Sequence, residues 1–153
     1  MDAPATGIRV IPPLLFLAAF LIAWGCHWLW PLSLGLPPAF QVTGAILSLA
    51  TLAIALYLAI VFVRGGSSFN TTKIPKKLIT GGLLRWSRNP AYVDLVVLGI
   101  GITLMFDNLW VLILMIPAVA VLQREVILKE EALLDGLFGE EYRQYKARVR
   151  RWL

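Results

Sequence analysis

Two short polar clusters carry the residue types that could do chemistry in this otherwise apolar chain. They occupy residues 81–94 and 125–151. The candidate groups are Arg88, Asn89, Pro90, Tyr92 and Asp94 in the first cluster, and Glu130, Glu131 and Tyr142 in the second. Carboxylates can hold ammonium groups or diols, an arginine or a helix N-terminus can hold a carboxylate, and tyrosine rings can stabilise a cation. The two clusters are therefore candidates for the parts of one site.

Asp94 stands one turn inside a hydrophobic segment, with Arg88 just before that segment. A charge at membrane depth is costly unless it is paired, so such residues tend to be functional. Two roles are open for Asp94: it pairs with Arg88, or it stands beside a bound acceptor. Both residues could instead anchor the helix end, where the macrodipole favours a carboxylate.

Glu130 and Glu131 are adjacent, so on a helix their side chains point ~100° apart. One of them can face a pocket while the other pairs outward, and the pattern does not say which. The alternative is an ordinary solvated face. Glu125 and Lys129 are spaced i,i+4, which predicts a helix ion pair.

The composition predicts an integral membrane protein. The 153 residues are 59% hydrophobic and 15% charged, with a mean hydropathy of +0.77, whereas soluble domains are nearer half apolar and a quarter charged. The net charge of +5 comes from basic residues next to apolar segments, which favours contact with lipid headgroups over nucleic acid. With one cysteine, Cys26, an intrachain disulfide is excluded.

The apolar segments predict an all-α fold with four transmembrane helices and an amphipathic C-terminal helical segment. The length suits a single membrane domain over residues 1–153. The spans are expected at about 13–30, 41–63, 91–106 and 109–127. Pro90 is expected at the first position of the third helix with Asn89 as its N-cap. Gly139 predicts a helix stop, and a last short helix is expected over 140–151.

The basic residues predict the orientation. Six of the fourteen Lys and Arg residues lie between the second and third spans, seven lie from Arg124 onward, and the last is Arg9. The two loops on the opposite side have none. The positive-inside rule then places both termini in the cytoplasm, with the chain in the inner or plasma membrane.

The two clusters together resemble the superfamily of isoprenylcysteine carboxyl methyltransferases and phospholipid methyltransferases. The first motif reads Gly-Leu-Leu-Arg-Trp-Ser-Arg-Asn-Pro-Ala-Tyr over residues 82–92. The second motif is Glu-Glu-x-x-Leu-x-x-x-Phe-Gly-x-x-Tyr-x-x-Tyr-x-x-x-Val-x-Arg, and it is filled throughout residues 130–151. This chain departs from the pattern by having Leu84 at an aromatic place, Asn89 at a place often held by His, and Asp94 at a place often held by Gly.

The resemblance implies a membrane methyltransferase that uses S-adenosylmethionine, without a metal. The cofactor-binding residues are expected to be Asn89, Pro90, Tyr92, Glu130, Glu131 and Tyr142. Arg88 and Asp94 are expected to be catalytic because their charges lie close to the bilayer edge, and not because the family pattern contains them. The acceptor would be lipid-like or a small amphiphile that enters from the bilayer, and no obligate protein partner is expected. One alternative is a nicotinamide-dependent reductase of an isoprenoid or sterol-like substrate, and another is a non-enzymatic helical membrane module.

Overall fold

The computed structural model describes residues 7–8, 10–64 and 77–153, and this part of the chain is helical without a strand. The elements are α1 (Pro12–Leu29), α2 (Pro38–Arg64), the 3₁₀ helix η1 (Gly82–Arg85), α3 (Pro90–Phe106), α4 (Leu109–Leu122), the π-helical turn η2 (Gln123–Ile127) and α5 (Leu128–Arg148). The predicted all-α class is confirmed.

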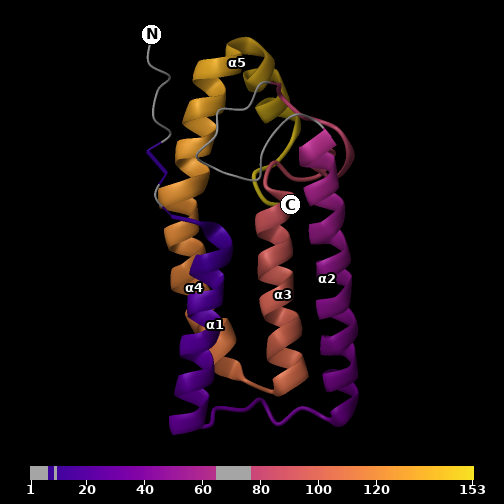
Figure 1. Ribbon diagram of the computed structural model, residues 1–153, viewed down its shortest axis with the longest axis vertical. Coiled ribbons are helices and arrows are strands. Elements are labelled where there is room, and N and C mark those ends of the chain that lie inside the picture. Colours follow the sequence, from indigo (N-terminus) through magenta and orange to yellow (C-terminus); the bar gives the residue numbers. More distant parts are fainter. Residues whose placement is uncertain (1–6, 9, 65–76) are drawn as a thin grey trace.

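The four long helices form a bundle made of two pairs, α1 with α4 and α2 with α3, joined mainly by the contact of α3 with α4 (Figure 1). The connections from α1 to α2 and from α3 to α4 lie at one end of the bundle. The end of α2, the start of α3, α5 and the C-terminus lie at the other end (Figure 1). This topology brings the two polar clusters of the sequence to the same end.

Small residues let α2 and α3 approach closely. A Cβ atom on Gly44 would collide with the backbone at Met105, and one on Gly101 would lie 2.6 Å from Ser48 Oγ. Close approach over small side chains is the usual way for apolar helices to pack in lipid, where no hydrophobic force drives them together. The two helices are therefore held in a fixed relation, and α3 carries the first polar cluster.

Three helical stretches are long and apolar enough to cross a membrane: α1, α2 and the continuous rod that begins with α4. Helix α3 is apolar but has 17 residues, which corresponds to about 26 Å. The four predicted spans correspond to four apolar helices, and α3 is shorter than α1, α2 and the continuous rod that begins with α4.

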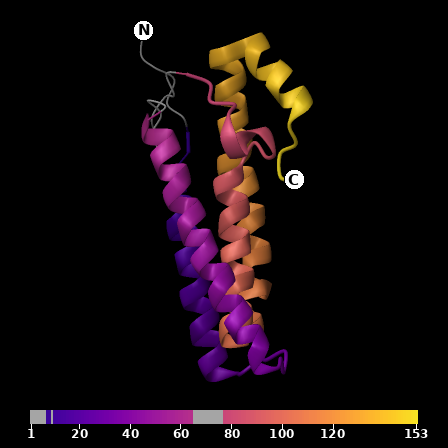
Figure 2. The same ribbon diagram turned by 90° about the vertical axis from the view of Figure 1, so that its right-hand side faces the viewer.

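The rod from α4 to α5 contains two irregularities. Residues Gln123–Ile127 form a π turn, which holds one residue more than an α-helical turn and so rotates the following side chains by roughly 100°. Gly139 has φ 49° and ψ −118°, and the rod bends sharply there, as the predicted stop required (Figure 2). The last helical segment then runs back toward the start of α3 (Figure 2).

The end of the chain differs from the sequence prediction. The helix expected to reach residue 151 ends at Arg148, because Val149 is extended (φ −120°, ψ 129°). The extended residues pair with the chain before α3: the Arg88 N–H donates to the Arg150 carbonyl at 2.9 Å. We call residues 149–153 the C-terminal strap.

A polar turn closes the opposite end of the bundle. Both carboxylate oxygens of Asp107 accept backbone N–H groups, from Leu34 at 2.9 Å and from Gly35 at 3.1 Å. The Leu109 N–H donates to the Leu32 carbonyl at 2.9 Å. The α3–α4 turn therefore fixes the α1–α2 connection, and with it the spacing of the two helix pairs.

Candidate active site

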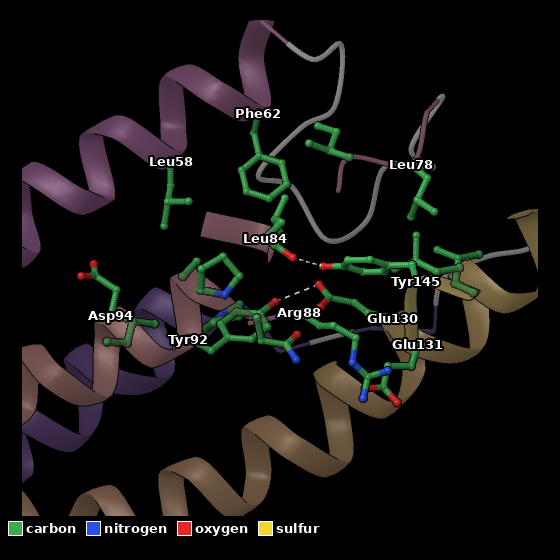
Figure 3. A pocket seen from close by; sticks show the side chains of 18 of the residues that line it. Leu58, Phe62, Leu78, Leu84, Arg88, Tyr92, Asp94, Glu130, Glu131 and Tyr145 are labelled. Atoms are coloured by element: carbon green, nitrogen blue, oxygen red, sulfur yellow. Dashed lines mark hydrogen bonds and ion pairs between the residues drawn. The ribbon is translucent and has the colours of Figure 1, made fainter. Parts of the chain in front are cut away.

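All eight residues that the sequence predicts for the site line a single cavity of about 570 Å³ at the end of the bundle where the two polar clusters meet. They are Arg88, Asn89, Pro90, Tyr92, Asp94, Glu130, Glu131 and Tyr142. Figure 3 shows the cavity from close by, with Asp94 far from Glu131 and with Tyr92 and Arg88 between them. A volume of this size is typical of small-molecule sites.

The C-terminal strap holds the chain just before α3. The Asn89 side chain donates to the Arg151 carbonyl at 2.9 Å, and the Ser87 hydroxyl donates to the same oxygen at 3.3 Å. The prediction that Asn89 caps α3 is right about its position and wrong about its side chain, which makes no capping hydrogen bond. The reason is that the strap offers a buried carbonyl that Asn89 satisfies instead.

Glu131 is the centre of a buried ion network. Arg151 binds it through two hydrogen bonds, Nε to Oε1 at 2.8 Å and Nη2 to Oε2 at 2.9 Å. Arg88 Nη2 lies 3.2 Å from Oε1 and Lys146 Nζ lies 3.9 Å from Oε2. Burial alone would raise the pKa of Glu131, but the Arg151 hydrogen bond and the charges of Arg88, Arg151 and Lys146 lower it overall. Glu131 is thus a carboxylate that the protein itself satisfies.

Glu130 is used far less by the protein. The Tyr92 hydroxyl donates to Glu130 Oε1 at 2.8 Å, and this is its one hydrogen bond within the part of the chain that the structure describes. Burial raises the pKa of Glu130 to about 7, although the Tyr92 hydrogen bond opposes the rise. This carboxylate faces the cavity with capacity for a further donor, since an ionised carboxylate accepts about four hydrogen bonds.

Arg88 presents unused donors. Its side chain is 9% exposed, and its Nε and Nη1 atoms are buried without a hydrogen-bond partner among the described residues. Of the two alternatives for Asp94, the pairing with Arg88 is not formed in the described part of the chain: Arg88 Nη2 pairs with Glu131. A buried guanidinium with two free donor nitrogens is a ready partner for a carboxylate or a phosphate.

Asp94 is the second incomplete group. It is 8% exposed and lines the cavity, and its Oδ1 atom has no hydrogen-bond partner within the described residues. Its position one turn inside α3 directs it toward the side of the cavity formed by α2, near Leu58 (Figure 3). The sequence alternative in which Asp94 stands beside a bound molecule agrees with this position.

Tyrosines and aliphatic residues form the wall next to Glu131. Tyr142 and Tyr145 pack with Leu78, and the Tyr145 hydroxyl donates to the Leu84 carbonyl at 2.7 Å. Burial raises the pKa of Tyr145 to about 12, so its hydroxyl stays a donor at neutral pH. Tyr142 and Tyr145 therefore form a packed wall of the cavity.

The sequence missed the apolar side of the cavity. Helix α2 contributes Ala55, Leu58 and Phe62, and the start of α1 contributes Ile11, Pro12 and Pro13. No polar signal marks these residues, because each looks like any other residue of an apolar helix. The sequence also missed Arg151 as the partner of Glu131, although the motif ends on it.

Comparison with known proteins bears on the identity of this site. The pattern of the phospholipid methyltransferase family matches residues 39–141, which include α2, α3, α4 and most of α5. A protein of Haemophilus influenzae described as uncharacterized is 37% identical over 62 residues, a stretch that covers 40% of this chain and 98% of that protein. No solved structure gives a significant match. The family resemblance read from the two motifs is confirmed, and the chain belongs to the phospholipid methyltransferase family.

Proposed function

We propose that this protein is an S-adenosylmethionine-dependent methyltransferase that acts at the membrane on a lipophilic or amphiphilic acceptor, in the manner of the isoprenylcysteine carboxyl methyltransferases. One observation supports it most: a single cavity has both a polar wall and an apolar wall. The polar wall contains Arg88, Glu130 and Glu131, and the apolar wall is formed by α2 and the start of α1. The polar wall suits a water-soluble cofactor, and the apolar wall suits an acceptor that comes from the bilayer.

The residues on the polar wall fit the cofactor's amino-acid tail. We assign its carboxylate to the free Nε and Nη1 of Arg88 and its ammonium group, or the ribose diol, to Glu130. Glu131 has the role of holding Arg88 in place, since Arg88, Arg151 and Lys146 already surround it. Asn89 and Pro90 shape the floor of the site, and Tyr142 supplies an aromatic face suited to a cation.

When bound, S-adenosylmethionine supplies a methyl group that is already activated on a positively charged sulfur. The chain's own residues then need to orient the two partners and to exclude water. The largely apolar lining from α1 and α2, together with buried Tyr142, serves that exclusion. In this arrangement both chemical partners lie at the bundle end that we predict to be cytoplasmic.

The test is calorimetric titration of the purified protein with S-adenosylhomocysteine. Wild type should bind, and Glu130→Gln should lose about ten- to hundredfold in affinity, because a charge-assisted hydrogen bond is worth about 1.5–3 kcal/mol. Glu125→Gln is the matched control, since Glu125 pairs with Lys129 at 2.7 Å outside the cavity. Equal affinities of Glu130→Gln and wild type would reject the assignment of Glu130. Binding of a reduced nicotinamide cofactor in place of S-adenosylhomocysteine would favour the reductase alternative.

A further inference from the structure

Asp94 is a buried charged group that the protein leaves unsatisfied. Asp94 is 8% exposed, and its Oδ1 atom has no hydrogen-bond partner in the described part of the chain. An isolated buried carboxylate is among the costliest features a fold can contain, and natural structures rarely keep one without a reason. Because Asp94 lines the cavity, a bound molecule can supply the missing donor.

The proposed cofactor site leaves Asp94 unassigned. The groups suited to a zwitterionic tail, Arg88 and Glu130, lie away from Asp94 along the cavity (Figure 3). Asp94 shares its part of the cavity with apolar residues of α2 and α3, among them Leu58 and Leu95. An apolar surrounding suits the lipophilic molecule, so the group that meets Asp94 belongs to the acceptor.

We infer that the acceptor presents an O–H or N–H group to Asp94, and that this protein differs from the isoprenylcysteine carboxyl methyltransferases in not methylating carboxylates. The inference rests on the proposed function and names its acceptor class: a long-chain amphiphile whose nucleophile carries a proton. A carboxylate has already lost its proton, and it would bring a second negative charge against Asp94 in a site of low polarity. A hydroxyl or amine instead satisfies Oδ1 directly.

The same contact accounts for the proton of the reaction. As the acceptor's oxygen or nitrogen forms its bond to the methyl carbon, the carbon–sulfur bond of the methyl donor breaks and its electron pair stays on sulfur. The O–H or N–H proton moves to Asp94 Oδ1, which is later deprotonated by solvent. Asp94 is therefore the base. The other cavity carboxylates have other partners: Glu131 is paired with three cations, and Glu130 accepts from Tyr92 and is assigned to the cofactor.

The experiment compares three probes of equal chain length: dodecanol, dodecylamine and dodecanoate. Binding of each to the full-length protein in lipid nanodiscs is measured without cofactor, and methyl transfer is measured with S-adenosylmethionine. We expect wild type to bind and methylate the alcohol or the amine at least tenfold better than the carboxylate. The probe that is methylated faster tells a hydroxyl acceptor from an amine acceptor.

The variant Asp94→Asn keeps the size of the side chain and removes its charge. It should lose about ten- to hundredfold in affinity for the amine, or in turnover of the alcohol, while its affinity for S-adenosylhomocysteine stays at the wild-type value and its melting temperature is equal to or higher than that of wild type. Asp135→Asn is the matched control, because the Asp135 side chain is 46% exposed and pairs with Arg143 outside the cavity.

Two results would overturn the inference: preferred binding or methylation of dodecanoate by wild type, or unchanged use of alcohol and amine by Asp94→Asn. The wild-type comparison decides the first without any variant, so a poorly folded variant cannot hide the answer. If binding of the probes depends on Asp94 but S-adenosylhomocysteine does not bind, the site for an O–H or N–H group at Asp94 is supported and the methyltransferase proposal is rejected.

Discussion

Helix α3 carries an aspartate at each end, and the protein uses the two in opposite ways. Asp107, at the C-terminal end, accepts two backbone N–H groups from the α1–α2 connection. Asp94, about 20 Å away near the N-terminal end, has Oδ1 buried without a partner among the described residues. The first carboxylate stabilises the fold, and the second costs stability.

The difference extends to the clusters around the two aspartates. Around Asp107 the polar groups bind one another: the Asn108 side chain accepts the Trp110 N–H, and the Trp110 indole donates to the Trp30 carbonyl. Around the cavity Arg88 keeps two donor nitrogens, Nε and Nη1, without a partner among the described residues. His27 Nδ1 is also buried without a partner, but His27 does not line the cavity. Unsatisfied groups mark a ligand site only where several of them share one cavity.

The largest expected effect comes from Glu131, the one cavity carboxylate that resembles Asp107 in being fully bonded. Glu131→Ala should cost about 3–5 kcal/mol of stability, because Arg88 would stay buried without its partner. Thermal unfolding in detergent measures this, with Glu140→Ala as a control that changes little, since the Glu140–Arg143 pair is exposed. An unaltered melting temperature for Glu131→Ala would show that the ion network does not hold the site.

The second-largest expected effect concerns Asp107, at the end of the bundle opposite the cavity. Asp107→Ala should cost about 1–3 kcal/mol, because two backbone N–H groups lose a charged acceptor. Its affinity for S-adenosylhomocysteine at a temperature where it is folded should equal that of wild type. If Asp107→Ala lost affinity for S-adenosylhomocysteine without losing stability, the proposal that one end of the bundle is structural and the other binds the ligand would be wrong.

The smallest effect concerns pH. Because burial raises the pKa of Glu130 to about 7, the folded protein holds this proton more tightly than the unfolded chain, and ionisation costs stability as pH rises toward 7. A ligand ammonium group binds the ionised form, so affinity for S-adenosylhomocysteine should rise roughly tenfold between about pH 6 and pH 8.

Two variants sharpen the pH test. Glu130→Gln should bind with no such rise, because it has no titrating group at this place. Tyr92→Phe removes the hydrogen bond that lowers the pKa of Glu130. The affinity of this variant for S-adenosylhomocysteine should therefore rise at higher pH than that of wild type. Identical pH profiles for all three proteins would mean that Glu130 does not meet a charged ligand group.

The sequence predicted the class of the fold and most of the polar wall. Apolar runs and their Pro, Gly and Asn boundaries gave four helices close to the observed ones, because helix length and end signals are local properties. Arg88, Glu130 and their neighbours came from motif spacing and share one cavity in the structure. The roles assigned to them stay predictions.

The remaining features depend on contacts between distant segments. The strap is extended because it pairs with residues 87–89, and no local sequence pattern in Val149–Arg151 predicts this pairing. The unequal use of Glu130 and Glu131 follows from where Arg88, Arg151 and Tyr92 arrive in space. Apolar residues of α1 and α2 line the cavity only because the bundle topology places them there.

The π turn at Gln123–Ile127 has a consequence for how relatives of this chain should be compared. One residue more or fewer in this turn leaves the apolar pattern on both sides intact, yet it changes which glutamate faces the ligand. An alignment that shifts a gap by one place here would exchange the roles of Glu130 and Glu131 without lowering its score noticeably. Among relatives, the number of residues between the fourth apolar helix and the Glu-Glu pair therefore carries as much information about the site as the glutamates themselves.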